Sequence, residues 1–131
     1  MTMPIVISGA GSGIGRSIAQ TLAERGYSLI LLGRNLGNLE STKNLLKNPS
    51  QHQCQPCDIR NSGEIHQALA NVSSLYGLIA NAGLGGENQY GEQDRWQEII
   101  DTNLTGTYQT IQECLPLIKK NPAPFKKIII I

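Results

Sequence analysis

The fold is decided by residues 4–15, PIVISGAGSGIG, in which a short apolar run leads straight into a glycine-rich loop. An apolar run of this length, bounded by glycines, is typical of a strand buried on both faces of a parallel sheet. Beyond the loop, apolar residues recur at helical spacing opposite charged ones, and this stripe predicts an amphipathic helix with a buried apolar face. The stripe consists of Ile14, Ile18, Ala19, Leu22 and Ala23. Gly26 suits the left-handed position that commonly follows a helix.

The same strand-and-helix unit recurs along the rest of the chain. Further strands are predicted at residues 29–32, 53–57, 78–80 and 128–131, and helices at residues 36–46, from Asn61 onward, and along a long stripe that ends before residues 121–124. The long stripe consists of Trp96, Ile100, Leu104, Ile111, Leu115 and Ile118. Pro56 makes the third strand the weakest prediction, because proline cannot donate to a ladder. Five strands alternating with four helices predict an α/β fold with a doubly wound, Rossmann-type parallel sheet. We expect one domain over residues 1–131, cut short after its fifth strand.

The composition excludes several classes of protein. The chain has 131 residues, of which 40% are hydrophobic and 16% charged, and this balance indicates one folded domain. A formal net charge of +1 gives no bias towards nucleic acid or an anionic membrane surface. No apolar run approaches the ~20 residues that a membrane span needs. The first residues lack the charged and apolar regions of a secretory signal, so the expected location is the cytoplasm.

Two of the three cysteines, Cys54 and Cys57, form a C-x-x-C pair. A redox motif of that kind needs its first cysteine at a helix N-terminus, where the thiol pKa is lowered. Here the pair lies in an extended stretch, in which residues three apart point to opposite faces. A zinc site would need two more ligands, and His52 and His66 have no convincing spacing. We therefore expect these cysteines to serve packing, and we expect no metal site.

The glycine loop has the spacing G-x-x-x-G-x-G, from Gly9, Gly13 and Gly15. The commoner fingerprint G-x-G-x-x-G fails, because position 14 is an isoleucine. The observed spacing serves the same purpose: a tight turn brings backbone N–H groups at a helix N-terminus within reach of a pyrophosphate, and a small residue lets the helix approach the strand. No G-K-[ST] follows, which excludes a P-loop. The alternative is a glycine-rich turn that binds nothing.

Arg34 follows the second predicted strand and indicates which dinucleotide the loop holds. A domain specific for NAD places Asp or Glu near this point, whereas a basic residue accommodates the 2′-phosphate of NADP. A guanidinium can make paired, charge-assisted hydrogen bonds to that phosphate. A methyltransferase would also carry an acidic residue here. The hypothesis is therefore an NADP(H) site, with NAD(H) the second choice; the alternative is a solvated surface arginine.

Four motifs in order resemble those of the short-chain dehydrogenase/reductase family. Ser8–Gly15 resembles its T-G-x-x-x-G-x-G, with serine in place of threonine. Asp58-Ile59 resembles the family's aspartate that bonds the adenine amino group. Ala80-Asn81-Ala82-Gly83 resembles N-N-A-G, with alanine for the first asparagine, and residues 101–106 resemble the segment that carries a helix asparagine. The resemblance spans nearly the whole chain.

The resemblance implies an oxidoreductase that moves a hydride between NADP(H) and a carbonyl or secondary alcohol. The cofactor-binding residues that it implies are Gly9, Ser12, Gly13, Ile14, Gly15, Arg34, Asp58, Ile59, Asn81, Ala82 and Gly83. It also implies that Asn103 holds water in a proton relay near the active site. Because Asn103 falls on the long apolar stripe, we expect a buried side chain that must find partners. The alternative for this residue is a core amide that only stabilises its helix.

The family's catalytic serine and its Y-x-x-x-K motif are absent from these 131 residues. The residues four positions after Tyr27, Tyr76, Tyr90 and Tyr108 are Leu31, Ala80, Asp94 and Gln112. We therefore expect the chain alone to be inactive, and three explanations compete: part of a longer enzyme, a truncated form, or a non-catalytic NADP(H)-binding or oligomerisation module. Four isoleucines on a final edge strand favour the first, because folded proteins avoid bare apolar edges. The resemblance further implies a homo-oligomer, dimer or tetramer, of the complete protein, with no nucleic-acid or membrane partner.

Overall fold

The computed structural model describes residues 3–85, 91 and 94–131, so that Tyr90, named above, lies outside the described part. Five parallel strands form one sheet in the order β3-β2-β1-β4-β5. The strands are β1 (Pro4–Ser8), β2 (Ser28–Gly33), β3 (Gln53–Pro56), β4 (Gly77–Ala80) and β5 (Lys127–Ile130). The helices are α1 (Gly13–Glu24), α2 (Leu36–Asn44), the 3-10 turn η1 (Pro49–Gln51), α3 (Ser62–Ala68), α4 (Trp96–Ile100), the π-helical segment η2 (Asp101–Gly106) and α5 (Thr107–Lys120). The predicted α/β fold with a doubly wound sheet is confirmed.

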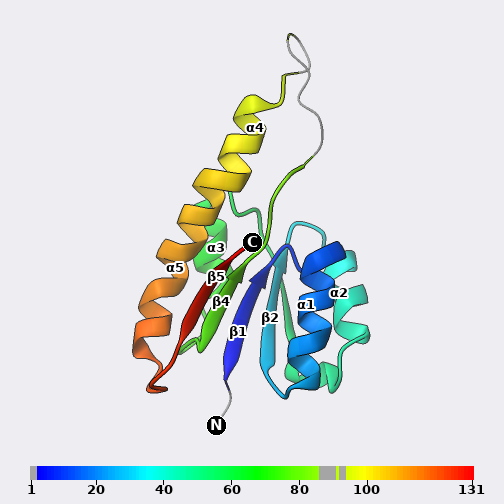
Figure 1. Ribbon diagram of the computed structural model, residues 1–131, viewed down its shortest axis with the longest axis vertical. Helices are drawn as coiled ribbons and strands as arrows, with labels where there is room; N and C mark the ends of the chain where they lie inside the picture. Colours follow the sequence, from blue (N-terminus) through cyan, green and yellow to red (C-terminus); the bar gives the residue numbers. More distant parts are fainter. Residues whose placement is uncertain (1–2, 86–90, 92–93) are drawn as a thin grey trace.

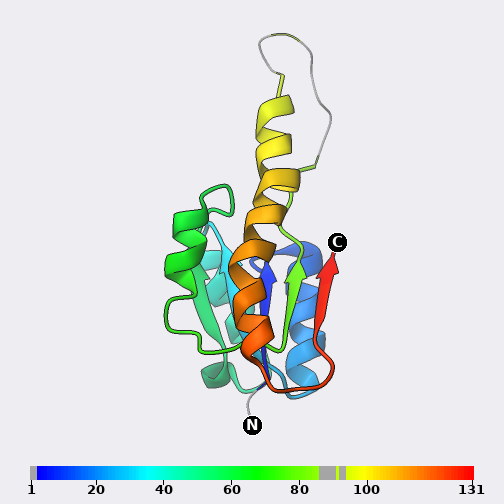
Figure 2. The same cartoon turned by 90° about the vertical axis from the view of Figure 1, so that its left-hand side faces the viewer.

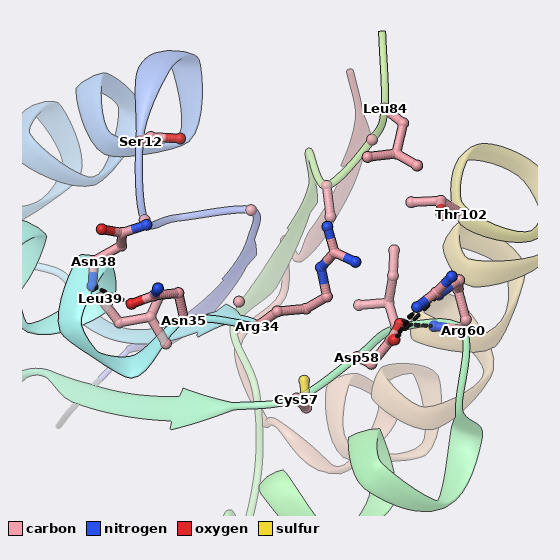
Figure 3. Close-up of a pocket in the computed structure, with 16 residues that line it drawn as sticks. Ser12, Arg34, Asn35, Asn38, Leu39, Cys57, Asp58, Arg60, Leu84 and Thr102 are labelled. Carbon is pink, nitrogen blue, oxygen red and sulfur yellow. Dashed lines mark hydrogen bonds and ion pairs between the residues drawn. The ribbon is translucent and has the colours of Figure 1, made fainter. Parts of the chain in front are cut away.

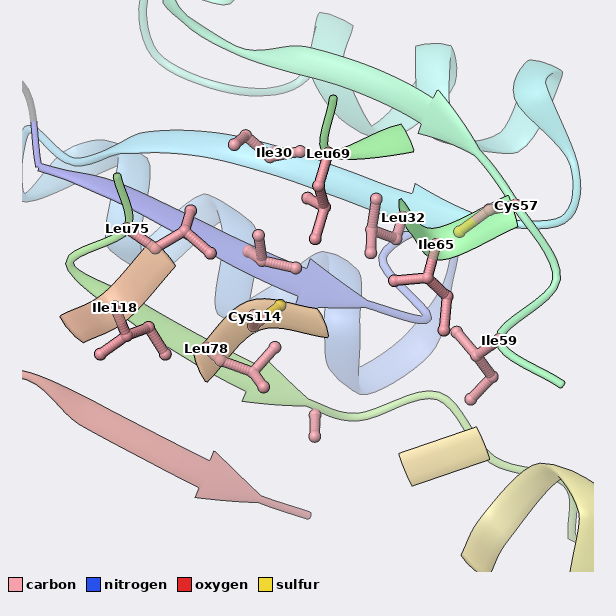
Figure 4. Close-up of a cluster of buried hydrophobic side chains, with 12 residues drawn as sticks. Ile30, Leu32, Cys57, Ile59, Ile65, Leu69, Leu75, Leu78, Cys114 and Ile118 are labelled. Atoms are coloured by element: carbon pink, nitrogen blue, oxygen red, sulfur yellow. The ribbon is translucent and has the colours of Figure 1, made fainter. Parts of the chain in front are cut away.

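Helices cover both faces of the sheet (Figures 1 and 2). Successive residues of a strand point to opposite faces, so each inner strand supplies two separate apolar clusters. In β1, Val6 belongs to the cluster beneath α3 and α5, which Figure 4 shows, whereas Ile5 and Ile7 belong to the cluster beneath α1 and α2. Continuous apolar strands are therefore required, as the run at residues 4–8 predicts. Of the helices that the structure describes, none combines the length and the hydrophobicity needed to span a bilayer.

The face that α1 buries differs from the predicted stripe. Ile14 is 63% exposed, while the buried residues of the helix are Gly15, Ala19 and Ala23, and Ile18 is only partly buried. The cause is the close approach of the helix start to β1, where only a small residue fits. The small residues of the helix therefore face the sheet, and its larger apolar residues lie beside this contact, where they are only partly covered or exposed. The assignment of Ile14 to the buried face is wrong.

The long helix is continuous from α4 through η2 to α5, and its apolar stripe also differs from the prediction. Trp96 is 63% and Leu104 65% exposed. The buried side consists of Gly106, Thr110, Cys114 and Ile118, each four residues from the next. Two causes combine: α4 projects beyond the carboxyl ends of the strands (Figure 1), and the wider π-helical turn shifts the register of the stripe.

The two edges of the sheet are formed by β3 and β5. Pro56 ends β3 opposite Gly33, and the next residue resumes the ladder, since Cys57 N donates to Gly33 O at 2.8 Å. An edge strand tolerates this proline, so the weakest of the predicted strands is confirmed. At the other edge, the isoleucines of β5 and Ile131 are 37–61% exposed.

Candidate dinucleotide-binding site

A pocket of about 250 Å³ opens at the carboxyl ends of the strands (Figure 3). The strand order places β1 between β2 and β4, so the chain reverses its direction of winding at this point, where open α/β sheets bind their ligands. The pocket is lined by the loops after β1, β2, β3 and β4, the start of α2, and Thr102 of η2. Sequence-distant loops thus meet here only because parallel strands share one carboxyl edge.

The pocket brings together seven of the residues that were predicted from the sequence to bind the cofactor or to lie near the active site. They are Gly9, Ser12, Arg34, Asp58, Ile59, Ala82 and Gly83. Five others do not line it: Gly13, Ile14, Gly15, Asn81 and Asn103. Of these five, Gly15, Asn81 and Asn103 contact residues or backbone that border the pocket, as described below.

The three motif glycines of the loop have different roles, and two of them stand where no side chain fits. Gly9 (φ +65°) and Gly13 (φ +53°) have left-handed backbone conformations, which glycine adopts without strain. A Cβ on Gly9 would lie 2.8 Å from the Ala82 Cα, and a Cβ on Gly15 would overlap the carbonyl oxygen of Gly9. Gly13 faces open space. Gly9 and Gly15 therefore permit close approach of backbone to backbone, while Gly13 serves the turn and leaves room beside it.

Ser8 and Asn81 tie the end of β1 to the end of β4. The Ser8 hydroxyl oxygen accepts hydrogen bonds from the backbone N–H groups of Asn81 and Ala82, each at 3.0 Å. In return, Asn81 Nδ2 donates to the carbonyls of Ser8 (3.3 Å) and Gly9 (3.2 Å). Asn81 therefore lies behind the loop and holds it against β4. The motif predicts a hydroxyl residue at position 8, but only the fold brings the two N–H groups within reach of the Ser8 hydroxyl oxygen.

Arg16 is one of the charged residues opposite the apolar stripe of the first predicted helix, and such a residue is expected to face solvent. Its guanidinium instead donates to the carbonyl of Gly11 (2.6 Å) and to the Thr42 hydroxyl (2.9 Å), and that hydroxyl donates to the carbonyl of Ala10 (2.8 Å). The glycine loop is thereby fastened to α2. A cation in the first turn of a helix is unfavourable for the helix dipole, and this placement was the one signal in the sequence.

The N-terminus of α1 begins beside the pocket and has the properties of an anion site. Ser12 occupies the N-cap position, yet its side chain makes no capping hydrogen bond, and the first turn contains no acidic residue. The first N–H groups of a helix have no partners within the helix and carry its positive dipole end. A phosphate group held here would supply the missing acceptors and a compensating charge.

Three charged side chains line the opposite part of the pocket: Arg34, Asp58 and Arg60 (Figure 3). Arg60 donates to both oxygens of the Asp58 carboxylate, from Nε at 3.0 and 3.1 Å and from Nη2 at 2.6 Å, and its backbone N–H donates to the same carboxylate at 3.0 Å. The side-chain hydrogen bonds from Arg60 hold the pKa of Asp58 below its ordinary value, and the charge of Arg34 acts in the same direction. Asp58 is thus an anion between two cations.

Asn103 lies in η2, and its side chain is exposed, so the expectation of burial is wrong. It has partners nonetheless. Its amide oxygen accepts from the Leu84 N–H (2.6 Å), and its amide nitrogen donates to the Leu84 carbonyl (2.8 Å). Asn103 thus bonds both the backbone N–H and the backbone carbonyl of Leu84. These two bonds fix the segment after β4 against the long helix. The prediction erred because the helix projects past the sheet at this point.

The C-x-x-C cysteines face different cores, as predicted: Cys54 packs against the α1/α2 cluster and Cys57 belongs to the α3/α5 cluster. Burial, with the negative charge of nearby carboxylates, raises the pKa of each thiol to about 11. Both ring nitrogens of His52 bond backbone groups, Leu29 N at 3.1 Å and Lys47 O at 2.8 Å. Within residues 3–85, 91 and 94–131, no group of three or more His, Cys, Asp or Glu side chains could hold a metal ion.

These thiols should react slowly with alkylating reagents. A thiol with a pKa of about 11 is almost entirely protonated at pH 8, and only the thiolate attacks. We expect iodoacetamide at pH 8 to label Cys54 and Cys57 at least tenfold more slowly in the native protein than in the urea-unfolded protein, which is the internal control. Mass spectrometry after timed quenching measures both rates. Rapid native labelling of Cys54 would contradict the packing interpretation and favour a reactive motif.

Comparisons with known proteins agree with this geometry. Residues 4–129 match the family model described as short chain dehydrogenase. An uncharacterized oxidoreductase of Staphylococcus aureus (strain MW2) is 35% identical over 117 residues, which are 85% of this chain and 50% of that protein. The crystal structure of a 3-ketoacyl-ACP reductase from Sinorhizobium meliloti 1021 is similar with a TM-score of 0.84 and 27% identity, and the similarity covers 97% of this chain and 52% of that one.

A third similar protein was solved with a nucleotide bound. It is an alcohol dehydrogenase from the archaeon Thermococcus sibiricus, complexed with 5-hydroxy-NADP, with a TM-score of 0.81 and 28% identity over 92% of this chain and 55% of that one. The chain spans about half the length of the curated relatives it matches.

Proposed function

Since this chain belongs to the short-chain dehydrogenase family, we propose that it forms the NADP(H)-binding part of an oxidoreductase that interconverts a carbonyl compound and a secondary alcohol. The observation that carries the proposal is the pocket at the carboxyl ends of the strands, which combines glycine positions closed to any side chain with a cationic wall. The structure of a similar alcohol dehydrogenase complexed with 5-hydroxy-NADP supports the choice of cofactor.

The residues of the pocket fit the parts of such a dinucleotide. The start of α1 and the loop at Gly9 and Ser12 would hold the pyrophosphate, because uncapped N–H groups and the helix dipole favour an anion there. Asp58 would accept a hydrogen bond from the adenine amino group, with Ile59 beside it. Arg34 would pair with the 2′-phosphate, which a guanidinium can bond through two donors.

The remaining residues would orient the reactive end. Bound NADPH supplies the hydride that reduces a carbonyl carbon. Ala82 and Gly83 line the pocket after β4, and Asn81 holds their segment in place. Asn103 clamps Leu84 and so fixes the next part of the same segment, from which position it would take part in a proton relay. The proton must come from a general acid. In the family this acid is the tyrosine of Y-x-x-x-K, a motif that these 131 residues do not contain.

Two properties of the complete protein belong to the same proposal. The long helix exposes large side chains on its outer side, Trp96, Leu104 and Tyr108, and such a surface suits contact with a second copy in a homo-oligomer. We further propose a cytoplasmic enzyme that acts on a small carbonyl or alcohol, and the net charge of +1 gives no bias towards nucleic acid or an anionic membrane surface.

The proposed function predicts that the 131-residue chain binds NADPH but does not oxidise it. General acid/base catalysis contributes ~10²–10⁴-fold, and nothing here supplies it. Binding is measured by titrating NADPH fluorescence, and turnover by the loss of absorbance at 340 nm with a panel of aldehydes and ketones. The matched comparison is a version of the protein that continues through a serine and a Y-x-x-x-K.

Three results would contradict parts of this proposal. Turnover by the 131-residue chain equal to that of the longer version would show that the chemistry does not depend on the absent residues. Binding without turnover by both versions would favour a non-catalytic NADP(H)-binding module. Failure of both to bind either NADPH or NADH would overturn the assignment of the pocket.

A further inference from the structure

We propose that Arg16 and Thr42 are positioning residues, which orient the glycine loop so that its backbone N–H groups can bind the 5′-phosphate side of a dinucleotide. The inference rests on the proposed function, because it takes this loop to hold the pyrophosphate. Neither residue lines the pocket, so both would act through the loop and not by contact with the cofactor. Their bonds to two carbonyl groups of the loop carry the argument.

Two successive peptide units of the loop have their carbonyl groups tied to these side chains. The Thr42 hydroxyl donates to the carbonyl oxygen of Ala10 at 2.8 Å, and Arg16 Nη2 donates to that of Gly11 at 2.6 Å. A trans peptide unit is planar, so its N–H group points in the direction opposite to its carbonyl. The N–H groups of Gly11 and Ser12 therefore point away from Thr42 and Arg16.

These two N–H groups are available to a ligand. Gly11 and Ser12 both line the pocket, and within the described part of the chain no protein group accepts a hydrogen bond from either N–H. Successive backbone N–H groups in a turn form a concave site that favours anions. If the carbonyls were released, either peptide unit could rotate and present its oxygen to the phosphate, which would repel it.

The two side chains form one network that fixes the loop to α2. Arg16 Nε donates to the Thr42 hydroxyl at 2.9 Å, and Arg16 Nη2 also lies 3.4 Å from the carbonyl oxygen of Asn38. Thr42 is completely buried and Arg16 is half-buried, so water competes little for these bonds. A threonine within a helix can bond the carbonyl four residues earlier, as Thr110 does in the long helix, whereas Thr42 donates to the loop.

A purely structural role is the competing explanation, since the loss of a buried hydrogen bond also lowers stability. The two explanations differ in which ligand is affected. The ligands 2′,5′-ADP and 2′-AMP share adenine, ribose and the 2′-phosphate, and only the first carries a 5′-phosphate. A loop that has lost its orientation should weaken only the ligand with the 5′-phosphate. A loss of stability alone should leave the ratio of the two dissociation constants unchanged.

Isothermal calorimetry gives this ratio for wild type and variants, and thermal unfolding without ligand gives their stabilities. We expect Thr42→Val to lower the preference for 2′,5′-ADP about five- to tenfold, because it keeps the shape of the side chain and removes the hydroxyl. Thr42→Ser keeps the hydroxyl and should leave the preference within about twofold of wild type. Arg16→Lys keeps the charge but lacks the paired donors that bond Thr42 and Gly11, so it should lower the preference about fivefold.

Two matched controls separate the orientation of the loop from other effects. Thr110→Val removes a hydroxyl bond of the same length, 2.8 Å, at an equally buried threonine that does not line the pocket. Arg25→Ala removes a positive charge from an exposed residue at the opposite end of α1. Both controls should leave the preference within about twofold of wild type, even though Thr110→Val lowers the unfolding temperature.

Three results would contradict the proposal or its premise. If Thr42→Val keeps the preference of wild type, or if Thr110→Val loses it to the same extent, the network does not orient the loop and the proposal is overturned. An unchanged preference in Arg16→Lys would show that a positive charge is sufficient, which overturns the role of the paired donors. If wild type binds 2′,5′-ADP no more tightly than 2′-AMP, the loop does not hold this phosphate, and the proposed function itself fails.

Discussion

Replacing Arg34 with alanine is expected to weaken the binding of NADPH by about tenfold or more, while the binding of NADH changes by no more than about twofold. A hydrogen bond to a charged group contributes about 1.5–3 kcal/mol, and 1.36 kcal/mol corresponds to a factor of ten in affinity. Only NADPH presents a 2′-phosphate to this guanidinium, so only its affinity should fall. Arg34 lines the pocket and extends into it, as Figure 3 shows.

Fluorescence titration of both cofactors against wild type, Arg34→Ala and Arg34→Lys measures the effect. Lysine keeps the charge but loses the paired donors, so an intermediate affinity for NADPH is expected. Arg25→Ala again controls for the loss of one positive charge at a distant site. Equal affinity of wild type for NADPH and NADH would show that Arg34 is a solvated surface residue and would remove the reason for preferring NADP.

The pattern of apolar runs was sufficient to predict the fold, because a parallel sheet with both faces covered needs strands that are apolar throughout. All five predicted strands and the helices between them are present, and even the strand with Pro56 pairs as an edge strand should. Which face each helix buries was harder to predict. The faces of α1 and of the long helix depend on how close a helix lies to the sheet and where the sheet ends, and neither property is local.

The part of the candidate site that could be predicted consists of residues that act through their backbone, such as glycines that are needed because no side chain fits. Gly9 and Gly15 stand where backbone meets backbone, and spacing alone located them. Residues that act through long side chains were missed. Arg16 bonds Thr42 of α2, which reaches it only after the chain folds. Arg60 bonds a carboxylate only two residues away, but no motif marks that arginine. The exposure of Asn103 could not be predicted either, because it depends on how far the long helix extends beyond the end of the sheet.

Of the glycines that the structure describes, Gly15 is the one whose replacement by alanine should have the largest structural effect. The new Cβ would overlap the carbonyl oxygen of Gly9 and lie 2.7 Å from Asn81 Nδ2. The first of these atoms is backbone, so relief requires α1 to move away from β1. Overpacking of this kind costs about 1–3 kcal/mol, occasionally more. The displaced helix would also carry its N-terminal N–H groups away from the pyrophosphate, so we expect the affinities for NADPH and NADH to fall together.

Two variants at Gly13 separate these two consequences. Gly13→Ala adds the same methyl group where no atom lies within 4 Å, at a backbone φ of +53°, and should cost only the ~1–2 kcal/mol of left-handed strain. Gly13→Val places a branched side chain beside the phosphate position, so it should weaken both cofactors while the protein stays folded. Urea unfolding followed by circular dichroism, with cofactor titration on the same samples, compares the three variants. A Gly15→Ala protein as stable as wild type, with unchanged affinity for both cofactors, would show that close contact between α1 and β1 is not what this site requires.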